Sequence, residues 1–179
     1  MARTYQVDAT KPADNSNALT SDLRANLSVL KNQSNNVYDV VAHYGADNTG
    51  VVATDIATIH TDATASGGVI VFPTGTYKIS VNQTINADVT LQFMPGAKLS
   101  IDSGKTVTIN GDIMAGLNQI FSGSGLVAGL HEVYPEWWGI DGVADEVQIN
   151  QAIQSVGSNG YINAKGKTYT TAAPIVMAN

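Results

Sequence analysis

A pattern that occurs twice limits the folds open to this chain. Each copy has an aromatic residue followed by glycine, then a helix-like stretch, and then a glycine-containing, strand-like segment. These parts fall at Tyr44-Gly45, 54–65 and 67–79 in the first copy, and at Trp138-Gly139, 145–155 and 160–169 in the second. The offset of roughly 92 to 94 residues is much longer than one repeat of a solenoid. Each copy is therefore predicted to cap a unit of stacked strands, as at the entrance of a β-helix.

The composition favours strands joined by tight turns. Charged residues make up 13% and hydrophobic residues 44% of the 179 residues, which is more typical of a mainly β chain than of long helices. The net charge of −6 without a Lys/Arg-rich run argues against nucleic acid or anionic lipid as a partner. The chain has no cysteine, which excludes disulfides, thiolate metal sites and cysteine nucleophiles.

The first 36 residues differ from the rest of the chain. Residues 1–18 are polar and predict an extended arm. Four leucines then recur at spacings of four, four and three, which places them on one narrow stripe of a short helix; they are Leu19, Leu23, Leu27 and Leu30. Such a stripe is typical of helices that self-associate, and we predict that it forms a trimer interface. Packing of the stripe against its own domain is the alternative.

Short runs with alternating apolar residues fill the middle of the chain. After an expected strand at 37–42, the runs are 84–85, 89–93, 97–101, 107–110 and 112–114. Turn-forming residues separate them at intervals of 8 to 10 residues, so each run can present one face to a core. A β-sandwich and the coils of a parallel β-helix both fit this pattern. Residues 120–125 predict a flexible Gly/Ser turn, and 133–138 lead into the second copy.

Several segments resemble bacteriophage tail spikes with a pectate-lyase-like fold. The stretch 39–79 resembles the entry segment of right-handed β-helix proteins, with the turn Pro73-Thr74-Gly75-Thr76-Tyr77. Residues 89–139 look like the linker of phage tail spikes, and 11–30 are similar to their particle-attachment segments. The chain departs from the family at Thr54-Asp55-Ile56, where a usual pair of aspartates is reduced to one. The second copy lacks the proline of the turn and has Ala164-Lys165-Gly166-Lys167 instead.

The resemblance implies a mainly β homotrimer with three parts. An arm and short helix (1–36) would bind a phage tail or baseplate protein, a β-rich head (37–133) would act as a spacer, and a connector (134–179) would begin a right-handed parallel β-helix. We expect the chain to be a fragment of a virion protein whose downstream region recognises a host surface polysaccharide. No apolar stretch has the length of a membrane span or a signal peptide, so we expect synthesis in the host cytoplasm and no membrane insertion.

An enzyme that cleaves polysaccharide is the main alternative function. Pectate-lyase-like folds can use acidic residues to hold calcium and a basic residue to abstract a proton. The candidates near the strands of 80–115 are Asp88, Asp102, Asp112, Lys98 and Lys105. Most of them occupy turn-like positions, where charged residues are expected for structural reasons. We therefore predict no catalytic residues and no cofactor in this chain, with any depolymerase activity lying downstream.

The acids of the two copies and the histidines offer weaker signals. Two sets of acids could supply the two catalytic carboxylates of a glycosidase. They are Asp47 with Asp55, and Asp141 with Asp145 and Glu146. Turn and helix-capping roles explain them better. His43, His60 and His131 have no histidine two or four positions away, which argues against a metal site.

Three aromatic residues lie at the start of the second copy or just before it. Tyr134, Trp137 and Trp138 surround Pro135, and aromatic faces can stack on sugar rings. Their position immediately before a predicted cap favours a second role, filling the junction between two stacked units. Both interpretations remain open from the sequence, and the first would make the chain a sugar-binding module.

Overall fold

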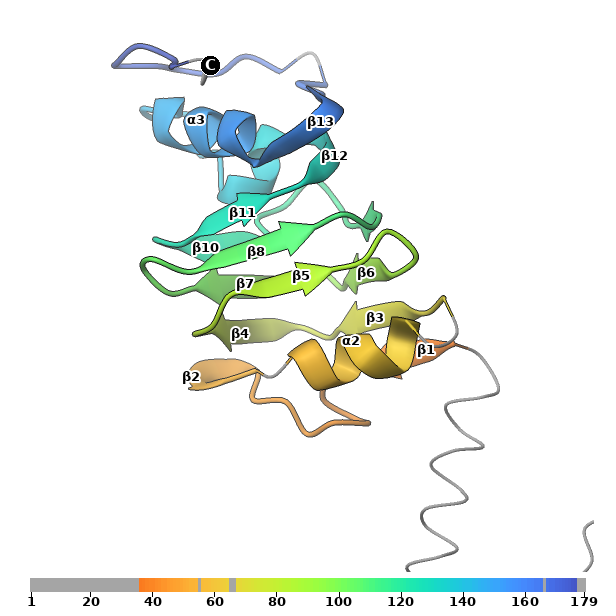
Figure 1. Cartoon of the computed structure of the whole chain (residues 1–179). Helices are drawn as coiled ribbons and strands as arrows, with labels where there is room; N and C mark the ends of the chain where they lie inside the picture. The colour runs from red at the N-terminus through yellow and green to blue at the C-terminus, as the bar shows by residue number, and fades with distance from the viewer. Residues whose placement is uncertain (1–35, 55, 65–66, 166, 177–179) are drawn as a thin grey trace, which may run out of the picture. The chain divides into compact units, whose positions relative to one another are not determined.

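The computed structural model describes residues 36–176 except 55, 65–66 and 166. The predicted arm, the leucine stripe and Asp55 lie outside the described residues. The described part is mainly β, with helices α2 (Ile56–Thr64) and α3 (Glu146–Ser155) and a short 3-10 helix, η1 (Pro135–Trp138). Figure 1 shows strands lying one above another, with α2 at one end and α3 at the other.

The strands form three parallel sheets and one further parallel pair. Sheet 1 contains β1 (Val37–Asp39), β3 (Val69–Phe72), β6 (Thr90–Phe93) and β9 (Ile113–Met114), in that order. Sheet 2 contains β2 (Thr49–Ala53), β4 (Gly75–Ile79), β7 (Ala97–Ile101) and β10 (Phe121–Gly123). Sheet 3 contains β5 (Gln83–Ile85), β8 (Thr106–Ile109) and β11 (Leu126–Ala128). The remaining pair is β12 (Leu130–Val133) with β13 (Val156–Ile162).

The chain visits the three sheets in a repeating order. Strands β3, β4 and β5 belong to sheets 1, 2 and 3, and β6 to β8 and then β9 to β11 follow in the same order. We call each such set of three strands a rung. Successive rungs pair in parallel, whereas a sandwich of the immunoglobulin type is built from antiparallel sheets. The strand runs predicted between 84 and 114 are confirmed as β5 to β9.

The alternating pattern of each run explains why the rungs stack. In β7, Ala97, Leu99 and Ile101 are buried while the residues between them are partly exposed, as the two-residue period of a strand requires. Strands β4, β7 and β10 pair without a register shift, so Tyr77 lies beside Leu99, and Leu99 lies beside Phe121. The inward side chains therefore form continuous rows from rung to rung.

Aromatic rings form one such row inside the stack. Phe72 stacks on Phe93 at a centroid distance of 5.0 Å, and Phe93 meets Phe121 edge-on at 6.1 Å. Phe121 in turn packs against Trp138 at 5.0 Å. These contacts connect two strands of sheet 1 to sheet 2 and then to η1, so the row joins the rungs to the second copy of the sequence repeat.

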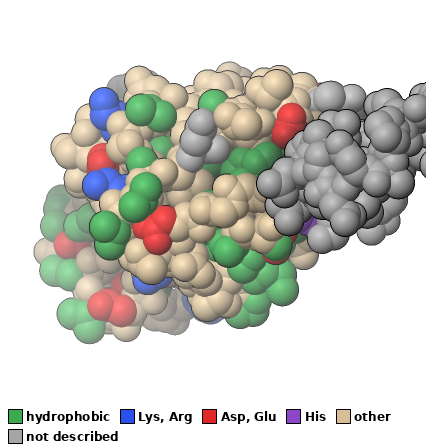
Figure 2. Space-filling view, turned by 90° about the horizontal axis from the view of Figure 1, so that it is seen from below, with side chains coloured by type: hydrophobic (Ala, Val, Ile, Leu, Met, Phe, Trp, Pro, Cys, Tyr) green, Lys and Arg blue, Asp and Glu red, His purple; other side chains and the backbone are tan. Residues whose placement is uncertain are grey.

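Helix α2 covers the end of the stack where β2 lies. Its residues Ile56, Ile59 and Ala63 are buried. The backbone N–H groups of Val51 and Val52 in β2 donate to Oδ2 of Asp47, at 2.9 and 2.7 Å, which occupies donors that an edge strand would otherwise expose. Both valine side chains are exposed, and Figure 2 shows hydrophobic side chains at the surface of this end.

The second copy of the repeat folds like the first in several respects. Each has a strand, a helix with one buried face and a strand parallel to the first, because β1 pairs with β3 across α2 and β12 pairs with β13 across α3. Asp47 and Asp141 both accept the N–H two residues ahead, from Thr49 and Val143. The two helix-like predictions are therefore confirmed.

Three local predictions differ from the structure. The strand expected at 37–42 ends at Asp39, because Oδ1 of Asp39 accepts the N–H groups of Val41 and Ala42 and turns the chain. Residues 120–125 contain β10 rather than only a Gly/Ser turn, because Phe121 has a place in the inward row and Ser122 faces outward. The strand predicted for 160–169 ends at Ile162. The residues after it are held mainly by side chains: Thr170 N–H donates to Asp145 and Ala172 N–H donates to Glu146, both at 3.0 Å.

Replacing Phe72 by Ala tests the aromatic row. Phe72 is fully buried between Tyr77 and Phe93, so the loss of its ring should lower the free energy of unfolding by about 3–5 kcal/mol. Replacing the exposed Met94 by Ala should change it by no more than about 0.5 kcal/mol. Urea unfolding followed by circular dichroism measures both; equal effects of the two substitutions would contradict the packing described here.

Candidate functional site

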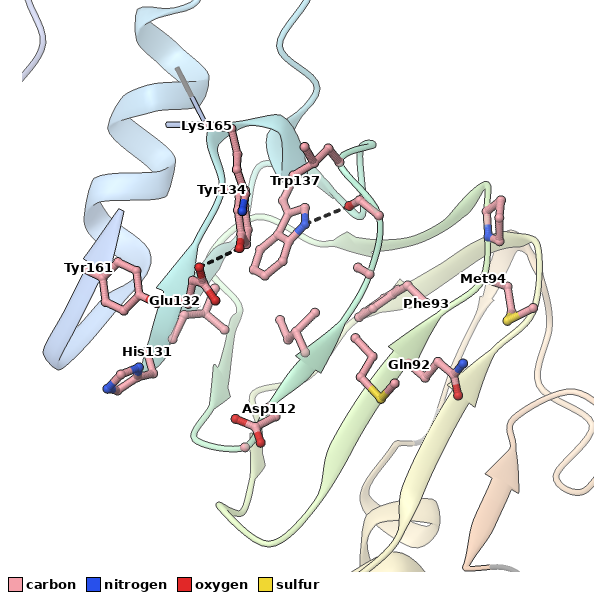
Figure 3. Close-up of a pocket in the computed structure, with 18 residues that line it drawn as sticks. Gln92, Phe93, Met94, Asp112, His131, Glu132, Tyr134, Trp137, Tyr161 and Lys165 are labelled. Carbon is pink, nitrogen blue, oxygen red and sulfur yellow. Dashed lines mark hydrogen bonds between the residues drawn. The ribbon is translucent and has the colours of Figure 1, made fainter. Parts of the chain in front are cut away.

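A groove lies beside β9, the last strand of sheet 1. It has a volume of about 910 Å³ and lies between the segment 111–117, which contains β9, and the pair β12–β13. Met94, from the turn after β6, also lines it, as do Tyr134, just before η1, and Trp137, within η1. Figure 3 shows these side chains gathered from parts of the chain that are distant in sequence.

Glu132 is the most strongly bonded acid of the groove. Its Oε1 accepts a hydrogen bond from the Tyr134 hydroxyl at 2.6 Å and another from Nδ2 of Asn163 at 3.0 Å. The Tyr134 hydroxyl contributes most to lowering the pKa of Glu132, and the Asn163 amide comes next, whereas burial opposes them. Glu132 is therefore a fixed negative charge at neutral pH.

Tyr134 lies between a cation and an indole. The Lys165 ammonium is 5.1 Å from the centre of its ring, within the range of a cation–π contact, and the Trp137 ring is 5.0 Å away on centroids. The hydrogen bond to Glu132 is the main cause that raises the pKa of Tyr134 to about 12, with burial second. The ring is thus held in place by three neighbours.

An exposed aromatic pair and apolar side chains form the rim. His131 and Tyr161 meet edge-on at 5.8 Å, one from β12 and the other from β13. Tyr161 is 50% exposed, and Met94, Met114 and Leu117 are 41%, 54% and 45% exposed. Apolar side chains with this much exposure, gathered in one groove, are typical of a surface that binds a partner.

The three aromatic residues singled out from the sequence have different surroundings. Trp137 and Trp138 are 3% and 7% exposed, whereas Tyr134 is half-buried. The Trp137 Nε1–H donates to the carbonyl oxygen of Gly116 at 3.1 Å, and Trp138 packs on Phe121. Rings with so little exposed surface have hardly any face to offer a sugar, and their contacts join η1 to the last rung.

The candidate lyase residues do not gather in one place. Asp102 is 3.7 Å from Nζ of Lys78 in a partly exposed ion pair. Asp112 lines the groove, whereas Asp88, Lys98 and Lys105 do not. Among the described residues, no hydrogen bond or ion pair links any two of these five side chains.

The acids of the repeat serve the backbone around the helices. Asp47 accepts N–H groups of β2, and its pKa is lowered to about 2, chiefly by the Thr49 hydroxyl. Buried Asp145 accepts the N–H groups of Asp141, Gly142 and Thr170, and the Thr170 N–H is the main cause of its lowered pKa. Glu146 has a lowered pKa because it accepts the Ala172 N–H.

The histidines lie apart. Asp39 N–H donates to Nδ1 of His43 at 3.1 Å, and Asn86 N–H donates to Nε2 of His60 at 3.0 Å, which fixes α2 to the turn before β6. His131 lies at the groove. Among the described residues, no three His, Asp or Glu side chains are placed to hold a metal ion. No helix in the described part has the length and apolar character needed to cross a membrane.

Comparisons with known proteins give no relative from which a function could be transferred. No protein-family model, curated protein or solved structure matches the chain.

The sequence did not indicate most of the groove. Glu132, Tyr161 and Lys165 belong to it and were not singled out. One signal was present: Glu132 and Tyr134 are two positions apart, so an extended backbone places them on the same side. Tyr161 and Lys165 come together with them only through the pairing of β12 with β13, which the local sequence does not encode.

Replacing Glu132 by Gln should lower the pKa of Tyr134 from about 12 toward the ordinary tyrosine value of roughly 10. The substitution removes the anionic acceptor, and with it the repulsion that opposes ionisation of the phenol. Titration of ¹³Cζ-labelled tyrosine by NMR measures this change. Tyr77 is the internal control, because its pKa of about 12 has burial as its main cause. An unchanged Tyr134 in the variant would show that Glu132 does not control it.

Proposed function

We propose that this chain is the N-terminal, particle-binding part of a homotrimeric bacteriophage tail spike or tail fibre. In this proposal, residues 1–36 bind a tail or baseplate protein of the virion. The rungs of 37–133 form a rigid spacer with the topology of a right-handed parallel β-helix, and 134–179 begin a second β-helix unit. A downstream region would recognise the host polysaccharide.

The observation that carries the proposal is the cyclic order of three parallel sheets. A chain that returns to the same three sheets in each rung, with inward rows in register, extends along one axis without changing its cross-section. This supports a spacer role, because stiffness along the stack comes from backbone pairing in three sheets at once. The duplicated cap supports a second stacked unit, as the resemblance to tail spikes implies.

The hydrogen bonds of the acidic side chains in the two repeat copies support a structural role. General acid–base catalysis requires a side chain whose titrating atoms are free to reach the proton that is transferred. Among the acids with hydrogen bonds, Asp47, Asp145 and Glu146 bind backbone N–H groups near α2 and α3. These bonds use the carboxylate oxygens to hold turns and strand ends. A polysaccharide lyase or hydrolase remains the alternative, with its active face on the strands of 80–115.

The trimer and the role of residues 1–36 follow from the sequence pattern. The stripe Leu19, Leu23, Leu27 and Leu30 would associate with its copies in two other chains. The polar arm before it would lie on the receiving tail protein. Both parts are separate in sequence from the rungs, so they can be altered while the rungs are left intact.

Deleting residues 1–18 tests the attachment role. A polar terminus contributes few buried contacts, so the truncated chain should unfold at the same urea concentration as the full chain. Light scattering should return the mass of three chains for both, because the leucines remain. Incorporation into phage particles, measured by immunoblotting of purified virions, should fall at least tenfold. Normal occupancy of the truncated chain would refute the role of the arm, and a monomeric mass of the full chain would refute the trimer.

A further inference from the structure

The three sheets end differently at the α3 end of the stack. The last strand of sheet 2, β10, is followed upward by η1, and Ile120 N–H, just before β10, donates to the Trp137 carbonyl oxygen at 3.0 Å. The last strand of sheet 3, β11, lies under α3. The last strand of sheet 1, β9, has neither cover: its outer side faces the groove.

The outer edge of β9 carries backbone groups available for pairing. On its inner side, Ile113 pairs with Leu91, and Leu91 N–H donates to the Asp112 carbonyl oxygen at 2.9 Å. In a parallel ladder the bonds to one neighbour come from alternate residues, so the N–H and C=O of Ile113 point to the other side. No described strand pairs with β9 on that side. β12, on the opposite wall of the groove, pairs with β13.

We propose that the groove receives one extended segment of a partner protein, which pairs with β9 as an additional strand of sheet 1. Backbone hydrogen bonds would supply the part of the affinity that does not depend on the sequence of the segment, as in other cases of strand addition. The walls on both sides leave β9 accessible to a single chain, while a whole sheet edge from another molecule would meet β12 and the Trp137 side. This distinguishes the groove from an aggregation-prone open edge.

The side chains of the groove define the chemistry of that segment. Met94, Met114 and Leu117 offer exposed apolar surface on the β9 side, which suits apolar side chains at alternate positions. The Lys165 ammonium already lies over the Tyr134 ring, near Glu132. The carboxylate of Asp112 lies at the opposite end of the groove (Figure 3), and no hydrogen bond or ion pair to it exists among the described residues. The segment should therefore carry a lysine or arginine that reaches Asp112.

Synthetic peptides test this proposal on the full 179-residue chain. The probe is acetyl-Lys-Thr-Val-Thr-Ile-Thr-Lys-amide, compared with the same peptide in which both lysines are glutamates and with one in which the central threonine is proline. Isothermal titration calorimetry should show saturable binding of the first peptide and at least tenfold weaker binding of the other two. The glutamate peptide would be repelled by Asp112, and proline would remove a backbone donor.

A matched pair of variants locates the binding. D112K should weaken binding of the lysine peptide at least tenfold, while D88K, which reverses an exposed acid on a turn outside the groove, should change it less than twofold. Hydrogen exchange followed by mass spectrometry should show slower exchange over 111–117 when the peptide is bound. Slowing elsewhere, or equal effects of the two variants, would overturn the proposal.

Two other occupants would give different results. If a dextran oligosaccharide binds at 111–117 and none of the peptides does, the groove is a glycan site and the proposal is wrong. The second case is a groove covered by another copy of the chain. Then no peptide binds at 1 mM, and hydrogen exchange at 111–117 is slow in the free oligomer but fast in a monomeric L23D/L27D variant. This result would also show that the proposal is wrong.

Discussion

Parallel backbone pairing between successive rungs is the constraint on which the other features depend. A strand has a side-chain period of two, so a shift of one residue in any pair would turn its inward row outward. Tyr77, Leu99 and Phe121 occupy one column because β4, β7 and β10 pair without a shift. The aromatic row, the position of η1 and the place of the groove all follow from that register.

At each end of such a stack, the last strands have backbone donors without a partner strand and inward side chains without a covering layer. At the β2 end, Asp47 accepts three backbone N–H groups of β2, and α2 buries three residues against the first rungs. At the other end, α3 and η1 cover two sheets. The groove exists because sheet 1 is left without such a cover. The exposed edge of β9 gives a physical reason for a binding role in addition to the proposed spacer role.

The sequence predicted those elements whose signals are local. The strand runs could be predicted because apolar residues alternate within short stretches bounded by turn residues, and the two helices could be predicted because each copy of the repeat contains one. Residues 120–125 were read as a turn because Gly123 and Gly125 dominate that stretch, whereas Phe121 is drawn into a strand by its neighbours in the row. The groove was not predictable in the same way, because Glu132, Tyr161 and Lys165 meet only after β12 and β13 pair around an intervening helix.

The register of the stacked strands can be measured directly, because the chain has no cysteine of its own. Thr76 and Lys98 are partners in neighbouring strands of sheet 2, where Cα atoms lie about 4.8 Å apart, a separation that suits a disulfide. The T76C/K98C double variant should form this bond within one chain under mild oxidation, as detected by mass spectrometry of the digested protein. The T76C/S100C variant, with its Cα atoms roughly 8 Å apart by strand geometry, should remain reduced. Equal cross-linking of the two pairs, or a bond only in T76C/S100C, would contradict the parallel register and with it the stacked architecture.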